Sequence, residues 1–307
     1  MPKEILVTGA TGFIGSQLSA ALVSEGHQVR AMTRKPEGYT GAGTAVFGDV
    51  ADPASVRDAL HGIRAAYYLV HSLGSGDFER RDARAARTFG QAAADAGVQR
   101  VVYLGGLGRD GADLSPHLRS RREVEKLLGD AGVPVTVLRA AVVIGHGGIS
   151  WEITRQLVDH LPAMVAPRWV KTRTQPIALP DVIRYLVGVL DSPDAVGQTY
   201  EVGGPEVLRY LDMMKRVAVI QNRRLLPVVT VPLLTPRLSS RWLQFITDVD
   251  VQTARTLIDS MSTEVIVKDR SIERIVPGPT LSYDDSIRLA LADREAALHA
   301  ATQGHAR

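Results

Sequence analysis

The stretch Val7-Thr8-Gly9-Ala10-Thr11-Gly12-Phe13-Ile14-Gly15 places three glycines at three-residue spacing near the start of the chain. The apolar run at residues 5–7 predicts a buried strand before it, and apolar residues at helical spacing predict a helix over residues 13–25. In such a strand–turn–helix unit the three glycines in turn allow a tight turn, close approach of the backbone to a pyrophosphate, and close packing of helix on strand. The helix N-terminus then presents free N–H groups to the phosphates. The stretch therefore predicts a dinucleotide site, and the alternative is a glycine-rich turn without a ligand.

The composition indicates a globular chain. Its 307 residues are enough for one large domain or two smaller ones, and 45% of them are hydrophobic. The net charge of +3 is too mild to predict nucleic acid as a partner, and the absence of cysteine excludes disulfides and thiolate metal sites. We expect no metal ion. The sequence shows neither a secretory leader nor an apolar run long enough to cross a bilayer, so we expect a cytoplasmic protein without a membrane span.

Strands and helices alternate through the first half of the chain. Further strands are predicted at residues 28–33, 45–50, 65–70, 100–104 and 133–144, and helices at residues 77–96 and 116–128. This alternation favours an α/β Rossmann fold with a doubly wound parallel sheet over residues 1–145. After Gly145 the regular alternation of strands and helices ends. We expect residues 146–307 to form a smaller C-terminal α/β substrate-binding region, partly interleaved with the Rossmann sheet.

The end of the second strand predicts which dinucleotide is bound. An acidic residue there would hold the ribose 2′-hydroxyl of NAD, but the chain has Arg34-Lys35, which suits a 2′-phosphate. NADP is therefore expected and NAD is disfavoured, unless the two cations are only a solvated loop. Asp49 is placed to accept from the adenine amine, with Val50 beside the ring. The full set of expected cofactor contacts is Gly9, Thr11, Gly12, Phe13, Ile14, Gly15, Arg34, Lys35, Asp49, Val50, Val70, His71, Ser72 and Val143.

The glycine pattern resembles the extended and atypical short-chain dehydrogenase/reductase superfamily, and the resemblance covers nearly the whole chain. Three later segments look like landmarks of that superfamily: Leu138-Arg139 with Gly145, Gln175-Pro176-Ile177 with Asp181, and Glu201-Val202-Gly203-Gly204-Pro205. Three more resemble its YbjT-like subgroup, which is related to NmrA-like proteins: His71-Ser72-Leu73-Gly74, residues 167–174 beginning Pro-Arg-Trp-Val, and residues 204–208. The resemblance implies NAD(P) binding, a Rossmann core and a smaller C-terminal substrate region.

The usual catalysts of that superfamily are absent. No tyrosine is followed by lysine at the expected spacing, and the strand that should end in a hydroxyl ends in Gly105-Gly106. The corresponding helix carries His117 and Arg121 instead, as in the subgroup that the chain resembles. Residues at i and i+4 share a helix face, so both can point at a nicotinamide. We expect His117 to act as an acid, since an unperturbed imidazole titrates near pH ~6.5, and Arg121 to act as an anchor for cofactor or oxyanion. The alternatives are that His117 and Arg121 are exposed residues of a surface helix, or that they only bind the cofactor.

The substrate cleft is expected at the crevice beyond the strand ends. Trp151 and Trp169 are candidates for its apolar wall, with core packing as the alternative, and Arg168 is a candidate for binding an acidic group. The sequence thus predicts an NADP-dependent oxidoreductase that transfers hydride to a small apolar carbonyl, enone or quinone. Two alternatives stay open: an NADP(H)-binding redox sensor without catalysis, and a redox-neutral cyclase or isomerase. A homodimer is compatible with the sequence, which does not establish one.

Overall fold

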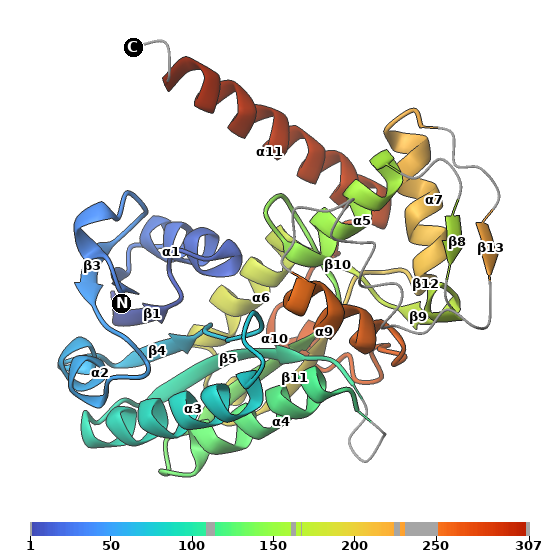
Figure 1. Ribbon diagram of the computed structural model, residues 1–307. Helices are drawn as coiled ribbons and strands as arrows, with labels where there is room; N and C mark the ends of the chain where they lie inside the picture. The colour runs from blue at the N-terminus through green and yellow to red at the C-terminus, as the bar shows by residue number, and fades with distance from the viewer. Residues whose placement is uncertain are drawn as a thin grey trace.

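A seven-stranded sheet forms the centre of the computed structural model, which describes residues 2–108, 114–160, 164–166, 168–223, 228–230 and 251–304 (Figure 1). The strand order is β11-β6-β5-β4-β1-β2-β3, and every neighbouring pair is parallel. Strands β2 and β3 follow on one side of β1, whereas β4 and the later strands of this sheet follow on its other side. This change of side between β1 and β4 defines the doubly wound arrangement that the alternation predicts. The predicted fold class is confirmed. The strands are β1 (Glu4–Thr8), β2 (Gln28–Thr33), β3 (Thr44–Phe47), β4 (Ala65–Tyr68), β5 (Arg100–Gly106), β6 (Val135–Ala140) and β11 (Thr199–Val202).

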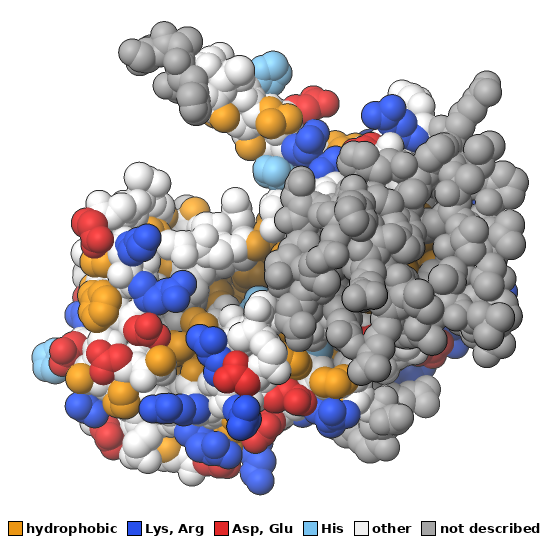
Figure 2. Space-filling view, viewed as in Figure 1, with side chains coloured by type: hydrophobic (Ala, Val, Ile, Leu, Met, Phe, Trp, Pro, Cys, Tyr) orange, Lys and Arg blue, Asp and Glu red, His pale blue; other side chains and the backbone are white. Residues whose placement is uncertain are grey.

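Helices cover both faces of the sheet because successive strand residues point to opposite sides. Ile5 and Val7 of β1 are fully buried in the core under α1 and α6, while Leu6 is fully buried in the core under α2, α3 and α4. The helices are α1 (Phe13–Ser24), α2 (Pro53–Leu60), α3 (Phe78–Asp95), α4 (Pro116–Gly129) and α6 (Leu179–Asp191). On the face that Figure 2 shows, Lys and Arg side chains intermingle with Asp and Glu over α2 and α3. The charges of α3 thus form a mixed, solvated face.

A separate core lies in the C-terminal region, where α5, α7, α9 and α11 pack together. The bounds of these elements are α5 (Ile149–His160), α7 (Tyr210–Ile220), α9 (Val251–Met261) and α11 (Tyr283–Gly304). Short strands pair beside them: β7 (Val143–Ile144) with β10 (Ile177–Ala178), β8 (Met164–Ala166) with β13 (Val228–Thr230), and β9 (Arg173–Thr174) with β12 (Leu208–Arg209). The remaining short helices are η1 (Pro36–Gly38), η2 (Arg168–Lys171), η3 (Pro193–Ala195) and α10 (Ile272–Ile275). The apolar run 133–144 is therefore two strands, because β7 leaves the main sheet to pair with β10.

Two elements from the second half of the chain belong to the main sheet. Helix α6 covers one face and β11 forms an edge beside β6. The expected division at residue 145 stays a prediction. In the part of the chain that the structure describes, no helix combines the length and the hydropathy that crossing a bilayer requires.

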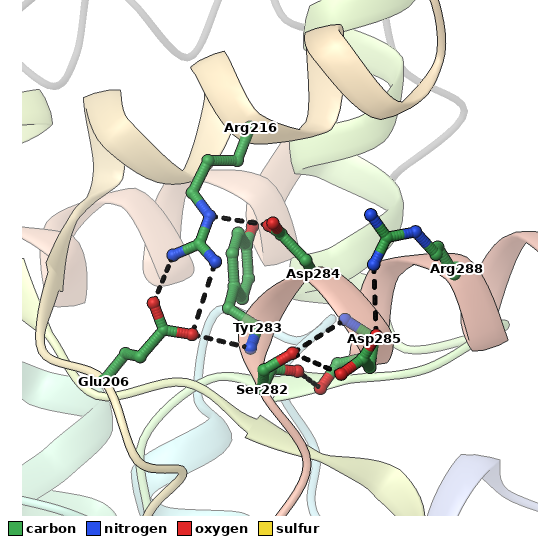
Figure 3. Close-up of polar contacts among 8 residues, drawn as sticks. Glu206, Arg216, Ser282, Tyr283, Asp284, Asp285 and Arg288 are labelled. Carbon is green, nitrogen blue, oxygen red and sulfur yellow. Dashed lines mark hydrogen bonds and ion pairs between the residues drawn. The ribbon is translucent and has the colours of Figure 1, made fainter.

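An ionic cluster ties α7 to the start of α11 (Figure 3). The guanidinium of Arg216 contacts the Glu206 carboxylate and donates to Asp284 at 2.6 Å, and it lies 5.3 Å from the ring centre of Tyr283. Glu206 in turn accepts from the backbone N–H of Tyr283 at 2.9 Å. The first turn of α11 is thus fixed to the C-terminal core, while its far end stands clear of the molecule (Figure 1).

The β1–α1 turn brings two backbone segments into close contact. Gly9 adopts a φ of +64°, in the left-handed region where L side chains are strained. A Cβ atom on Gly15 would lie well under 3.0 Å from the carbonyl oxygen of Gly9. Helix α1 can sit this close to β1 only if position 15 lacks a side chain.

Replacing Gly15 tests this contact. Gly15→Ala is expected to lower the free energy of unfolding by about 2 kcal/mol, because backbone atoms must separate. At an open helix position the same change would stabilise the protein by up to ~1 kcal/mol. A loss of stability therefore indicates the close contact at Gly15. Urea unfolding followed by circular dichroism measures it. Gly38→Ala is the control, since a Cβ there meets nothing within 4 Å; equal stability of the two variants would contradict the prediction.

Candidate functional site

A cleft of about 250 Å³ opens at the carboxyl ends of β1, β4, β5 and β6. This edge of the sheet includes the switch point between β1 and β4, where ligands of doubly wound folds bind. The residues that line the cleft come from the glycine loop, the strand ends, α4, the start of α5 and α9. They are Gly9, Gly12, Phe13, Ile14, Gly15, Leu69, His71, Leu73, Leu104, Gly105, Gly106, His117, Arg121, Ala140, Ala141, Val143, Gly148, Ile149, Ser150 and Leu257.

The glycine loop forms one side of this cleft. Gly12 is the N-cap of α1, and among the described residues no side chain caps the first N–H groups of that helix. Its own N–H donates to the carbonyl oxygen of Gly9 at 2.9 Å, which closes the turn. Uncapped N–H groups and the positive end of a helix dipole favour an anion. The loop therefore fits the pyrophosphate of a dinucleotide, with Phe13 and Ile14 of the first helical turn in the lining and Thr11 exposed beside it.

The residues predicted to hold the adenosine half lie further along the same edge, beyond the cleft itself. Arg34 and Lys35 follow β2 directly and are exposed, and among the described residues neither has an ion-pair partner. Asp49 follows β3, and its carboxylate accepts from the N–H of Ala51 at 2.9 Å. Val50 is half-buried beside the core. The structure thus gathers the four predicted residues at the ends of β2 and β3, and their contacts with a cofactor stay a prediction.

The loop after β4 supplies the next predicted contacts. His71 lines the cleft, whereas the half-buried Val70 packs on the core. The His71 side chain is exposed at the edge of the cleft, and partial desolvation by its neighbours and the nearby Arg121 guanidinium lower its pKa. Ser72 hydrogen bonds to the buried carboxylate of Asp82, which fixes the loop to α3. Val143 of β7 lines the opposite side of the cleft.

His117 and Arg121 lie one turn apart on α4 and both line the cleft. The Nε–H of Arg121 donates to Nε2 of His117 at 3.4 Å, and Nη1 donates to the hydroxyl of Tyr103 at 3.3 Å. Nδ1 of His117 lies 3.3 Å from the hydroxyl of Ser260 on α9. Burial of the imidazole, the Arg121 charge and His71 lower the pKa of His117 to about 3. This lowering favours the neutral imidazole at physiological pH, and the role of His117 as an acid stays a prediction.

Three neighbours of this pair were not found from the sequence. Tyr103 is fully buried within an apolar strand, Asp82 is 6% exposed on the charged helix α3, and Ser260 lies in α9. The Asp82 carboxylate favours the charged form of Arg121. Nothing in the local sequence separates these three side chains from ordinary core or surface residues, because they meet only when β5, α3, α4 and α9 come together.

The end of β5, where the superfamily has a hydroxyl side chain, leaves little space for one. A Cβ on Gly105 would lie 2.7 Å from Oε1 of Glu125, and one on Gly106 would lie 2.7 Å from Cδ2 of Leu118. The ends of two α4 side chains therefore occupy the space in which a serine or threonine side chain would stand, and they would have to move to admit one.

The predicted aromatic wall needs correction. Trp151 is fully buried and Trp169 is 8% exposed, and both belong to the C-terminal core. The Trp169 ring packs edge-on against Tyr210, with 5.7 Å between ring centres. Neither indole lines the cleft, because α5 turns Trp151 towards α7 and α11. The side chain of Arg168 lies outside the part of the chain that the structure describes.

Comparison with known proteins agrees with the site. Residues 9–168 match a family described as NAD(P)H-binding. The chain is 30% identical over 233 residues to (4-alkanoyl-5-oxo-2,5-dihydrofuran-3-yl)methyl phosphate reductase of Streptomyces griseus subsp. griseus, covering 72% of this chain and 75% of that protein. It therefore belongs to this NAD(P)H-binding family.

Two further similarities are more distant. The chain is 25% identical over 233 residues to mitochondrial NADH dehydrogenase (ubiquinone) 1 alpha subcomplex subunit 9 of Mus musculus, covering 72% of this chain and 62% of that one. Its fold matches that of an NADPH-dependent quinone oxidoreductase of Escherichia coli in complex with NADPH, with a TM-score of 0.74 and 19% identity, covering 92% and 98% of the two chains.

Substituting Gly12 tests the phosphate side of the cleft. Gly12→Val is expected to abolish NADPH binding in calorimetric titration, because the side chain occupies the path of the pyrophosphate. A Cβ at this position lies 3.2 Å from the carbonyl oxygen of Gly9, so the loop needs only a slight adjustment to accept it. The far-ultraviolet circular dichroism spectrum should therefore match that of the unmodified protein. A folded variant that binds NADPH with unchanged affinity would place the dinucleotide elsewhere.

Proposed function

We propose that this protein is an NADPH-dependent reductase that transfers hydride to a small apolar enone, quinone or other activated carbonyl compound. One observation carries the proposal: the glycine loop and the half-buried Arg121 line the same cleft. The relation to a reductase that is 30% identical and acts on a dihydrofuranone supports the reaction class. The matching fold of an NADPH-dependent quinone oxidoreductase is compatible with it.

The residues of the cleft suit a reaction in which negative charge develops on a substrate oxygen. Bound NADPH supplies the hydride. Arg121 keeps its charge at every accessible pH, and its guanidinium can donate to that oxygen. Leu73, Leu104 and Leu257 offer apolar contacts to the substrate. Hydrogen-bond donors fixed before the reaction begins are worth more than donors in water.

The neutral state of His117 favours some substrates over others. A simple ketone becomes an alkoxide on reduction and needs a proton donor, whereas an enone or quinone gives a delocalised anion that a cation can stabilise until solvent protonates it. With a pKa of about 3, only a very small fraction of His117 is protonated at neutral pH and able to act as an acid. Arg121 is present in its active charge state throughout. We therefore favour enones and quinones, with His117 orienting Arg121.

The exposed Arg34-Lys35 pair supports a preference for NADPH over NADH. A charge-assisted contact to the 2′-phosphate contributes about 1.5–3 kcal/mol, so at least about tenfold tighter binding of NADPH is expected. Arg34→Ala should reduce this ratio while changing NADH affinity little. Arg57→Ala, which removes an exposed arginine of α2, is the control. Titration of both dinucleotides measures the ratio, and tighter binding of NADH by the unmodified protein would refute the assignment.

The pH dependence separates the two roles for His117. With menadione as substrate and NADPH oxidation followed by absorbance, the rate is expected to stay within about threefold from pH 5 to 9, because Arg121 does not titrate there. Arg121→Met should lower kcat about 10²-fold, and His117→Ala about tenfold. If protonated His117 were the required acid, its pKa of about 3 would make the rate fall about tenfold per pH unit across this range. That profile, abolished in His117→Ala, would return the acid role to His117.

A binding protein without catalysis is the second candidate. It is favoured by Gly105-Gly106, where the substrate-orienting hydroxyl of the superfamily is missing, and by the similarity to a subunit of NADH dehydrogenase. The same assay decides between the two. A sensor binds NADPH but oxidises it with no member of a panel of enones and quinones.

A further inference from the structure

We propose that Ser260 of α9 is a positioning residue that fixes the tautomer of His117 and, through it, the orientation of Arg121. The consequence for catalysis rests on the proposed function, whereas the consequence for the tautomer does not. Four hydrogen-bonding groups in a row carry the inference: the Thr256 carbonyl, the Ser260 hydroxyl, the His117 imidazole and the Arg121 guanidinium.

The position of each proton follows from counting donors. The Ser260 hydroxyl donates to the carbonyl oxygen of Thr256 at 3.0 Å. A hydroxyl has only one hydrogen, so towards its other neighbours Ser260 can only accept. With the Ser260 hydrogen on the Thr256 carbonyl, Nδ1 of His117, 3.3 Å from the Ser260 oxygen, carries the imidazole proton, and the Nε–H of Arg121 facing Nε2 requires the same tautomer. The Ser115 hydroxyl, 3.0 Å from the same oxygen, donates its own hydrogen there while accepting from the N–H of Leu118 at 3.3 Å.

The second imidazole nitrogen then has a defined role. A neutral imidazole that is protonated at Nδ1 has a bare Nε2, which can only accept. The Nε–H of Arg121 points to this atom at 3.4 Å, and Nη1 of the same guanidinium donates to Tyr103 at 3.3 Å. Two acceptors behind the guanidinium hold its plane, and the N–H groups on the other side are left for a ligand in the cleft. The low pKa of His117 is in keeping with a neutral ring.

The alternative tautomer would disrupt this arrangement. If Nε2 carried the proton, an N–H donor would face the Nε–H donor of Arg121, and the guanidinium would have to move. Because Ser260 and Arg121 both favour the first tautomer, α9 of the C-terminal region helps to orient a cation that lines the cleft. Leu257, one turn earlier on α9, lines the same cleft. The C-terminal region thereby contributes both a wall and a hydrogen bond to the site.

Nitrogen-15 NMR of the full-length, labelled protein tests the inference directly, with the His117 signals assigned through His117→Gln. The unmodified protein should show one tautomer, protonated at Nδ1. Ser260→Ala should show a mixture, and Ser260→Thr, which keeps the hydroxyl, should restore the single form. Ser262→Ala, an exposed serine two residues further on, should change nothing. In turnover with menadione, Ser260→Ala should lower kcat about tenfold, the worth of one hydrogen bond, with the KM for NADPH unchanged.

Two results would overturn the assignment. One is a His117 protonated at Nε2 in the unmodified protein, and the other is a Ser260→Ala variant that keeps the single Nδ1–H form. If no substrate is reduced by any variant, the proposed function fails, yet the NMR spectra still decide the role of Ser260. If turnover is found and Ser260→Ala keeps both its tautomer and its full kcat, only the positioning role is lost.

Discussion

The close approach of α1 to β1, at the contact between Gly15 and the carbonyl of Gly9, is the constraint on which the rest of the site depends. It brings the uncapped N-terminus of α1 to the carboxyl edge of the sheet. Because the sheet is entirely parallel, the ends of β4, β5 and β6 arrive at the same edge. The cleft, the phosphate cradle and the catalytic candidates therefore share one location.

Arg121 is the second determinant of the site. It is a cation set into the floor of the cleft, with a neutral imidazole and a tyrosine hydroxyl as its hydrogen-bonding partners and the Asp82 carboxylate nearby. A cation held in this way attracts anionic groups that form in the cleft. Together with desolvation, which is the larger cause, it lowers the pKa of both neighbouring histidines. The site is consequently better suited to stabilising an oxyanion than to delivering a proton.

The sequence predicts the fold well because strands, helices and turns are indicated by patterns among neighbouring residues. Apolar runs and glycine spacing in the first half identify β1, α1 and the doubly wound order, and the Arg34-Lys35 pair is indeed found at the end of β2. The chemistry of the site depends on residues that are far apart in the sequence. The pKa of His117 depends on burial, on Arg121 and on His71, which follows a different strand, and Ser260 reaches the ring from 143 residues away. Trp151 fails as a cleft residue for the same reason, since only packing shows that it belongs to the C-terminal core.

A crystal structure of the protein with NADPH would test the central claim most directly. The account predicts the pyrophosphate against the first turn of α1 and the nicotinamide beside Arg121, leaving room for a substrate carbon about 3–3.5 Å from the hydride-donating carbon. It also predicts the adenosine 2′-phosphate at the Arg34-Lys35 pair. A dinucleotide bound outside this cleft, or a nicotinamide directed away from Arg121, would contradict the account.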